Sequence, residues 1–254
     1  MSRMFPFITV PDWNPLGGKC SHRCSYCWAQ GPKGLVNYYK MRKYQGEPRI
    51  VESELLRRFE VDDFVFVCDM CDLFAESVPE KMILRILGVI ENNSQARFLL
   101  MTKNPSRYDQ FVKHWQIPSN AVLGVTVETN RSHFCENNPR ISYSDISEAC
   151  PPKTRLLAME NLLLGQLINK GFVRHFFISI EPILDFNLDG PTPRDNFAEY
   201  IIELQPWAVA VGYDNYNNHL PEPPLEKTMQ LIERLEKAGI TVFRKTLRER
   251  WNGL

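Results

Sequence analysis

Three cysteines near the N-terminus are the residues whose type and spacing point most directly to chemistry. Cys20, Cys24 and Cys27 are separated by three and then by two residues, on one short polar stretch. Thiolates are soft ligands that suit iron–sulfur clusters and zinc, and close spacing lets one loop surround a small metal core. Three cysteines leave the fourth iron of a four-iron cubane without a protein ligand. That iron has an open coordination position for a substrate or cofactor. The triplet therefore predicts an iron–sulfur site with an open iron.

Zinc is the alternative for the same residues. His22 or a more distant cysteine could complete a zinc knuckle, although structural zinc sites usually pair two Cys-x2-Cys knuckles. A disulfide is a weaker interpretation, because an odd count of 7 cysteines and a thiolate cluster fit a reducing compartment better than an oxidising one.

Length and composition indicate one large α/β domain over residues 1–254. The chain has 44% hydrophobic and 24% charged residues, which is an ordinary globular composition. No apolar run approaches the roughly 18 residues that span a bilayer, and the N-terminal apolar stretch is too short and proline-containing for a signal peptide. We therefore expect a cytoplasmic protein with no membrane partner.

The charge balance gives no general sign of nucleic-acid binding. Lys and Arg number 30 and Asp and Glu number 30, so the formal net charge is zero. Local basic stretches occur at residues 40–43 and 244–250, and such stretches are usually solvated faces.

Strands alternate with helices along the chain. We predict a long loop between residues 130 and 150, where Asn, Ser and Pro are frequent. The alternation implies a parallel sheet with right-handed crossovers, although the pattern alone does not separate an open doubly wound sheet from a barrel. Predicted strands cover residues 5–10, 64–68, 97–101, 121–127, 176–180, 207–211 and 241–243, and predicted helices cover residues 53–59, 79–90, 105–115, 153–170, 195–204 and 225–235.

The cysteine triplet, with Tyr26 before its third cysteine, resembles the signature of radical S-adenosylmethionine (SAM) enzymes. In that family three cysteines hold a [4Fe–4S] cluster, and the amino and carboxylate groups of SAM chelate the fourth iron. One electron then cleaves SAM to methionine and a 5′-deoxyadenosyl radical, which abstracts hydrogen from a substrate. The resemblance implies both cofactors here, a place for Tyr26 beside them, and an electron donor such as flavodoxin or ferredoxin.

Shorter motifs resemble one group within that superfamily. They are Trp-Asn-Pro at 13–15, Asp-Leu-Phe at 72–74, Met-Thr-Lys at 101–103, Gly-Val-Thr-Val-Glu at 124–128 and Ile-Glu-Pro at 180–182. Together they resemble a phage-associated radical SAM family that is distantly similar to spore photoproduct lyase. The resemblance spans nearly the whole chain and implies an α/β fold, a partial (β/α)6 TIM-like barrel of parallel strands.

Polar residues follow the predicted strands, at the edge where parallel α/β barrels place their chemistry. Asp69 and Asp72 follow the second strand, where radical SAM proteins bind the SAM amino group. Lys103 follows the third strand, where a cation could pair with the methionyl carboxylate.

The later strands end in further candidates. Glu128 follows the fourth strand, where related enzymes often place a ribose-binding side chain. Glu181 follows the fifth strand, and a buried carboxylate at such a place needs a partner. Gly212 follows the sixth strand and lacks a side chain, so the backbone could approach the adenine there, although a simple turn glycine explains it equally well.

Cys68 and Cys71 form a second Cys-x2-Cys. Cys135 and Cys150 could complete a second metal site with them, but Cys68 ends an apolar run in which a free cysteine behaves as a small hydrophobe. Cys71 is a separate candidate, for a hydrogen donor, because it lies at the mouth of the predicted site.

The substrate is not readable from motifs. The chain ends soon after its last predicted strand, so we expect a barrel open at its side that accepts a nucleic acid, a protein segment or a closing partner. Two other classes stay open. One is a non-enzymatic iron–sulfur or zinc-binding protein, and the other is a nucleic-acid-binding module with the basic segment 244–250 as its footprint.

Overall fold

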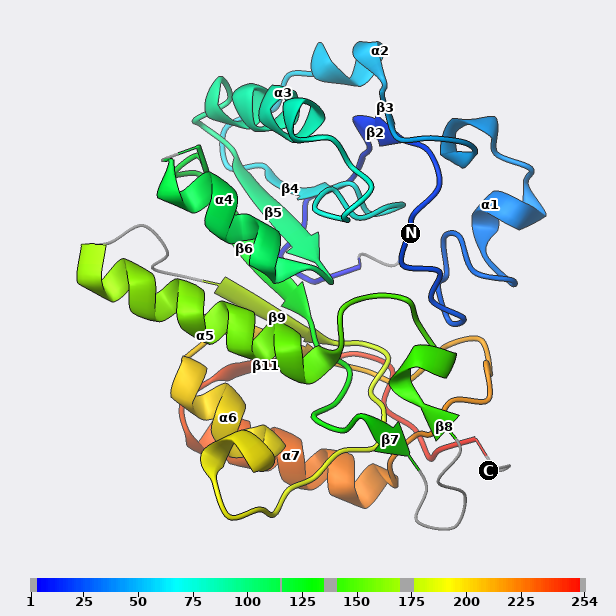
Figure 1. Ribbon diagram of the computed structural model, residues 1–254, viewed down its shortest axis with the longest axis vertical. Coiled ribbons are helices and arrows are strands. Elements are labelled where there is room, and N and C mark those ends of the chain that lie inside the picture. The colour runs from blue at the N-terminus through cyan, green and yellow to red at the C-terminus, as the bar shows by residue number, and fades with distance from the viewer. Residues whose placement is uncertain (1–3, 115, 135–140, 170–175, 252–254) are drawn as a thin grey trace.

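A parallel sheet forms the centre of the molecule. The computed structural model describes residues 4–114, 116–134, 141–169 and 176–251, and its main sheet has seven strands in the order β1-β4-β5-β6-β9-β10-β11 (Figure 1). All six ladders between neighbouring strands are parallel. The strands are β1 (Val10–Trp13), β4 (Phe64–Val67), β5 (Arg97–Thr102), β6 (Ala121–Thr126), β9 (Phe176–Ile180), β10 (Ala208–Val211) and β11 (Thr241–Arg244).

The strand order confirms the partial barrel. Each strand pairs with the next main-sheet strand along the chain, without the reversal of order that defines a doubly wound sheet. The carboxyl ends of all seven strands therefore meet at one edge, which is where the candidate residues were predicted.

Helices cover the outer face of the sheet. Figure 1 shows them as a layer around its convex side: α3 (Glu80–Glu91), α4 (Tyr108–Lys113), α5 (Pro152–Asn169), α6 (Phe197–Leu204) and α7 (Leu225–Lys237). In α3, the buried residues Ile83, Ile86, Leu87 and Ile90 recur at helical spacing, as predicted. Burying one such side chain stabilises the fold by roughly 1.5–3 kcal/mol, so this stripe fixes the helix on the sheet.

The concave face is filled by the N-terminal segment. Phe5, Phe7 and Ile8 pack there, with the Phe5 and Phe7 ring centroids 4.8 and 5.3 Å from that of Phe177. The prediction of a first strand at residues 5–10 is therefore wrong. The Ile8 amide donates to the Phe5 carbonyl in a turn, and β1 begins only at Val10. The aromatic residues suggested a strand, but they serve to fill the inside of the barrel.

Shorter elements complete the fold. The predicted helix at 53–59 is only the turn α2 (Glu52–Leu55), and the predicted long loop at 130–150 is structured in its described part, because Phe134 and Tyr143 are buried.

No helix in the described ranges is long and apolar enough to cross a membrane. The other elements are β2 (Leu16–Gly17) paired with β3 (Arg49–Ile50), α1 (Leu35–Tyr38), η1 (Arg42–Tyr44), η2 (Pro105–Arg107), β7 (His133–Phe134) paired with β8 (Ile141–Ser142), η3 (Tyr143–Asp145) and η4 (Pro193–Asp195).

Candidate functional site

The three cysteines lie on one loop between β2 and α1, which we call the cysteine loop (residues 18–30). Gln30 closes this loop: its side-chain oxygen accepts from the Cys20 amide at 2.8 Å, and its side-chain nitrogen donates to the Met70 carbonyl at 3.0 Å. The Gln30 amide donates to the Cys27 sulfur at 3.2 Å, and the Cys24 sulfur lies 3.0 Å from the Ser147 hydroxyl. The loop backbone is therefore held from several sides.

Tyr26 ties the cysteine loop to the carboxyl edge of the sheet. Its buried hydroxyl donates to the Glu128 carboxylate just after β6, and the Lys103 ammonium just after β5 donates to the same oxygen. The Lys103 ammonium also lies 5.2 Å from the centroid of the Tyr26 ring. The structure thus brings together three of the predicted residues.

Arg155 completes this cluster. Its guanidinium donates to the second Glu128 oxygen at 2.9 Å and to the Thr126 carbonyl at 2.7 Å, and both charged side chains are 0% exposed. Burial would raise the pKa of Glu128, but Arg155 and Lys103 together lower it to about 2. Glu128 is therefore an ionised carboxylate held between two cations.

Arg155 was missed by sequence reasoning, although a signal for it exists. It precedes the buried residues Met159 and Leu162 of α5 by four and seven positions, so it lies on the apolar face of that helix. An arginine on such a face needs a buried anionic partner.

A second tether runs through Asp72. The His22 ring nitrogen lies 2.7 Å from one Asp72 oxygen, and the Thr102 hydroxyl and Lys103 amide donate to the same carboxylate at 2.8 and 2.7 Å. Burial would raise the pKa of Asp72, but His22 and these donors lower it overall. Asp72 was predicted to contact SAM; in this structure its oxygens connect the cysteine loop to β5.

Asp69 has different hydrogen-bond partners from Asp72. Its carboxylate accepts from the Asn14 side chain at 2.5 Å, and burial raises its pKa to about 6. Asn14 also accepts from the Met70 amide at 3.3 Å, so Asp69 belongs to the contact between the ends of β1 and β4.

Glu181 and Gly212 form a separate group at the ends of β9 and β10. Glu181 accepts from the Ser179 hydroxyl at 3.4 Å and lies 4.0 Å from the Lys245 ammonium, while burial raises its pKa. A Cβ atom on Gly212 would lie 2.8 Å from the Lys245 Cβ and 2.9 Å from a Glu181 oxygen. Gly212 therefore permits a close approach, here to Glu181. In the described part of the chain no hydrogen bond joins this pair to Tyr26 or Glu128.

Cys68 and Cys71 lie together at the end of β4. The Cys71 thiol donates to the Leu16 carbonyl at 3.5 Å, and the neighbouring Cys68 together with burial raises the pKa of Cys71 well above its usual value, so Cys71 keeps its S–H hydrogen. Cys150 lies in the loop before α5, and Cys135 lies outside the described residues.

The donor set fits an iron–sulfur cluster in its chemistry. Burial raises the pKa of Cys20 to about 12 and also raises that of Cys24, so both are thiols until a metal displaces the proton. Within the described ranges no three His, Cys, Asp or Glu side chains converge as ligands of one metal ion. A four-iron cluster does not require such convergence, because each cysteine binds a different iron.

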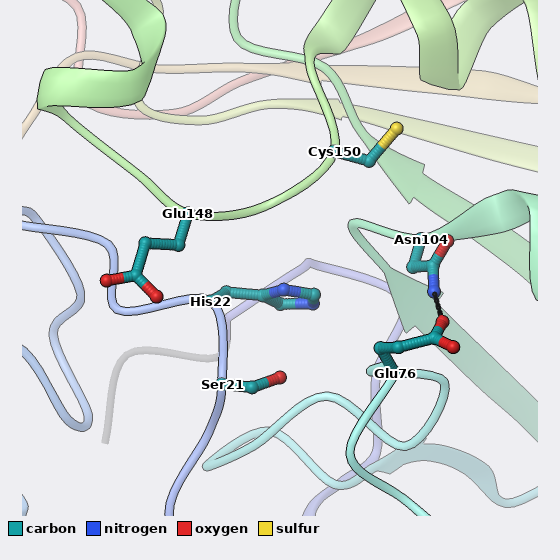
Figure 2. Close-up of a pocket in the computed structure, with 6 residues that line it drawn as sticks. All are labelled: Ser21, His22, Glu76, Asn104, Glu148 and Cys150. Atoms are coloured by element: carbon teal, nitrogen blue, oxygen red, sulfur yellow. Dashed lines mark hydrogen bonds between the residues drawn. The ribbon is translucent and has the colours of Figure 1, made fainter.

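A cavity of about 300 Å³, lined mainly by polar residues, adjoins the cysteine loop (Figure 2). Ser21 and His22 face it from the loop, and the other side chains come from the segments after β4, after β5 and before α5. The remaining lining residues are Glu76, Asn104, Glu148 and Cys150. The cavity gives a polar group access to the flank of the loop.

The fold is shared with spore photoproduct lyase. A mutant of that enzyme and its complex with dinucleoside spore photoproduct each align with a TM-score of 0.52 and 10% sequence identity, over 91% of this chain and 76% of theirs. The predicted resemblance to this enzyme is therefore confirmed at the level of the fold. The comparison with curated proteins finds no match.

One family model matches the sequence. It is described as a protein of unknown function, DUF5131, and it matches residues 8–189. The match begins before β1 and ends after β9, so it contains the cysteine loop and the Tyr26–Glu128–Arg155 cluster. The chain belongs to the DUF5131 family.

Proposed function

We propose that this protein is a radical SAM enzyme in which Cys20, Cys24 and Cys27 hold a [4Fe–4S] cluster. The observation that carries the proposal is the cysteine loop itself, which two buried tethers fix at the carboxyl edge of a partial barrel shared with spore photoproduct lyase. When bound, the cluster and SAM supply a one-electron cleavage that yields a 5′-deoxyadenosyl radical able to abstract hydrogen.

Lys103 is the proposed partner of the SAM carboxylate. Glu128 is contacted by both Lys103 and Arg155, and Arg155 makes its own ion pair at 2.9 Å. Arg155 therefore still neutralises Glu128 if Lys103 turns toward a second carboxylate, so the buried glutamate is never left without a cation.

The other strand-end residues are proposed to position the cofactors. Asp72 and Tyr26 hold the loop that carries the thiols. Glu181 and Gly212 form the edge of the sheet at β9 and β10, which we assign to the adenosyl part of SAM, and Asp69 is a further polar group at β4. Cys71 keeps a hydrogen that it could donate.

A nucleic acid is the substrate class that we propose. A spore photoproduct lyase with the same fold was solved in complex with dinucleoside spore photoproduct, and this supports a nucleic-acid substrate over a protein segment. Flavodoxin or ferredoxin is the proposed electron donor, in a reducing cytoplasmic compartment.

Metal analysis after anaerobic reconstitution with iron and sulfide tests this proposal. We expect about four irons and four sulfides per chain, and an electron paramagnetic resonance signal of the reduced cluster that changes when SAM is added. Cys24→Ala should lose the cluster, whereas Cys150→Ala, a matched change outside the triplet, should keep it. Zinc as the only bound metal would contradict the proposal. A cluster whose electron paramagnetic resonance signal does not change when SAM is added would indicate a non-enzymatic iron–sulfur protein.

A further inference from the structure

Two neighbouring tyrosines are exposed beside the cysteine loop. Tyr38 is 77% exposed and Tyr39 is 65% exposed, and their ring centroids lie 4.7 Å apart in an edge-to-face arrangement. Figure 1 shows α1, which carries Tyr38, at the right edge of the molecule, away from the helices that cover the sheet. Two large aromatic side chains exposed at one place are typical of a binding surface.

The segment that carries these tyrosines, residues 31–44, is firmly attached; we call it the basic arm. Val36 and Tyr44 are buried against Ala29 and Met70, and the partly buried Cys27 packs on the same cluster. The Val36 amide donates to the Ala29 carbonyl at 2.9 Å. The exposed rings therefore stand on a rigid base that is continuous with the cysteine loop.

The basic arm carries uncompensated positive charge. The arm has four Lys and Arg residues and no Asp or Glu, although the whole chain has a net charge of zero, and Lys43 is paired with Glu54. Lys33, Lys40 and Arg42 are exposed, and within the described part of the chain none of them forms a salt bridge with an acidic side chain.

The basic arm also contacts the segment that follows β10. The Lys33 ammonium donates to the carbonyls of Tyr216 and Asn217 at 3.0 and 2.9 Å. Tyr216 lies in the segment after β10 and is itself 46% exposed. The Tyr216 backbone therefore lies beside the basic arm, at the carboxyl edge that holds the candidate site.

The basic C-terminal segment behaves differently. Arg244 pairs with Glu236 at 2.8 Å, and Arg248 pairs with Glu222 at 2.7 Å. These internal pairs neutralise two cations of the segment 244–250, which weakens the expectation that this segment is a nucleic-acid footprint.

We propose that the basic arm docks single-stranded nucleic acid, with bases stacking on Tyr38 and Tyr39 and phosphates lying against Lys33, Lys40 and Arg42. Exposed aromatic rings and cations without acidic partners on one surface are the combination that binds single strands, because every base has a π-face and every nucleotide carries a negative charge. The arm adjoins Cys27, so a strand bound there lies next to the site. This proposal extends the proposed function. The role of the bound strand in catalysis rests on the proposed function, whereas the binding of a strand to the arm does not.

Fluorescence anisotropy of the full-length protein with labelled oligothymidylate and oligouridylate, each of about twelve nucleotides, tests the proposal. We expect binding at about 50 mM salt that weakens as salt rises. Tyr38→Ala and Tyr39→Ala should each weaken binding by about 5-fold to 100-fold, whereas Tyr38→Phe should retain it. Replacing Lys40 and Arg42 by alanine should reduce the salt slope by roughly 0.7 for each phosphate that is no longer neutralised.

Two controls make the result specific. Leu56→Ala removes a side chain that is 79% exposed at the end of α2, and Lys237→Ala removes a cation that is 73% exposed on α7; neither should change binding. The proposal is overturned if neither strand binds, or if the Tyr38→Ala/Tyr39→Ala double variant binds as the wild type does. SAM cleavage without oligonucleotide, measured on the same variants, should be unchanged, so failure of the docking surface is distinguishable from failure of the radical SAM proposal.

Discussion

Tyr26 of the cysteine loop and Glu128 at the end of β6 are joined by a hydrogen bond between two buried side chains. Arg155 and Lys103 hold the same carboxylate from its other sides. The position of the cysteine loop therefore depends on residues that lie more than seventy positions away in the sequence. Substitutions in this cluster should therefore change the positions of the cysteine thiols.

Replacing Tyr26 by phenylalanine removes one hydrogen bond to a charged group and little else. We expect the free energy of unfolding of the metal-free protein to fall by about 1.5–3 kcal/mol, and reconstituted protein to retain less iron. Urea denaturation and iron analysis measure the two effects. Tyr38→Phe, at an exposed ring, should change neither. Equal stability and iron content in Tyr26→Phe and the wild type would show that the hydrogen bond does not hold the loop.

Replacing Arg155 by methionine leaves Glu128 with Lys103 as its only cation. We expect a loss of about 3–5 kcal/mol in the free energy of unfolding, because the change breaks a fully buried ion pair. Arg85→Met, which removes a solvent-exposed pair with Glu52, should cost far less, because water screens an exposed ion pair. Denaturant titration of both variants checks this difference, and similar losses in the two would argue against a buried pair.

The depressed pKa of Glu128 predicts a loss of stability in acid. Its usual pKa of 4.5 falls to about 2 in the folded protein, so its contribution is present above about pH 4.5 and is lost as the pH falls through about 2. Denaturation curves between pH 5 and pH 2 should fall more steeply for the wild type than for Glu128→Gln. Parallel curves for the two proteins would contradict the ion-pair assignment.

Gly212 and Gly88 should respond oppositely to alanine. At Gly212 the new Cβ would lie 2.8 Å from the Lys245 Cβ, so we expect a loss of about 1–3 kcal/mol. At Gly88, within α3, nothing lies within 4 Å of the new atom, so alanine should stabilise the helix by up to about 1 kcal/mol. Thermal melting of both variants checks the signs. An unchanged melting temperature in Gly212→Ala would mean that Glu181 and Lys245 can move aside.

The sheet was largely predictable, because its buried strands are apolar runs that end in polar residues or turns. The run Phe64–Val67 is buried throughout, which is the pattern of a parallel strand covered on both faces. The segment Phe5–Ile8 misled the prediction, since its aromatic residues suit both a strand and the filling of a concave face. Only tertiary packing decides between these two roles.

The site residues that directly follow strands could be predicted from the sequence. Lys103 and Glu128 follow neighbouring parallel strands, and such ends meet at one edge whatever the details of packing. Arg155 was missed because it enters from a helix, and no rule of strand order places a helical side chain in the site. His22 was considered as a zinc ligand, but its ring lies against Asp72, a contact between residues fifty positions apart.

Formation of 5′-deoxyadenosine would be direct evidence that this protein cleaves SAM as a radical SAM enzyme. The reconstituted protein is reduced with dithionite under anaerobic conditions, supplied with SAM, and the products are separated by chromatography. We expect 5′-deoxyadenosine and methionine from the wild type and from Cys150→Ala, and neither product from Cys24→Ala. A reconstituted protein that carries its cluster and never cleaves SAM, with or without an oligonucleotide, would contradict the assignment of this chain as a radical SAM enzyme.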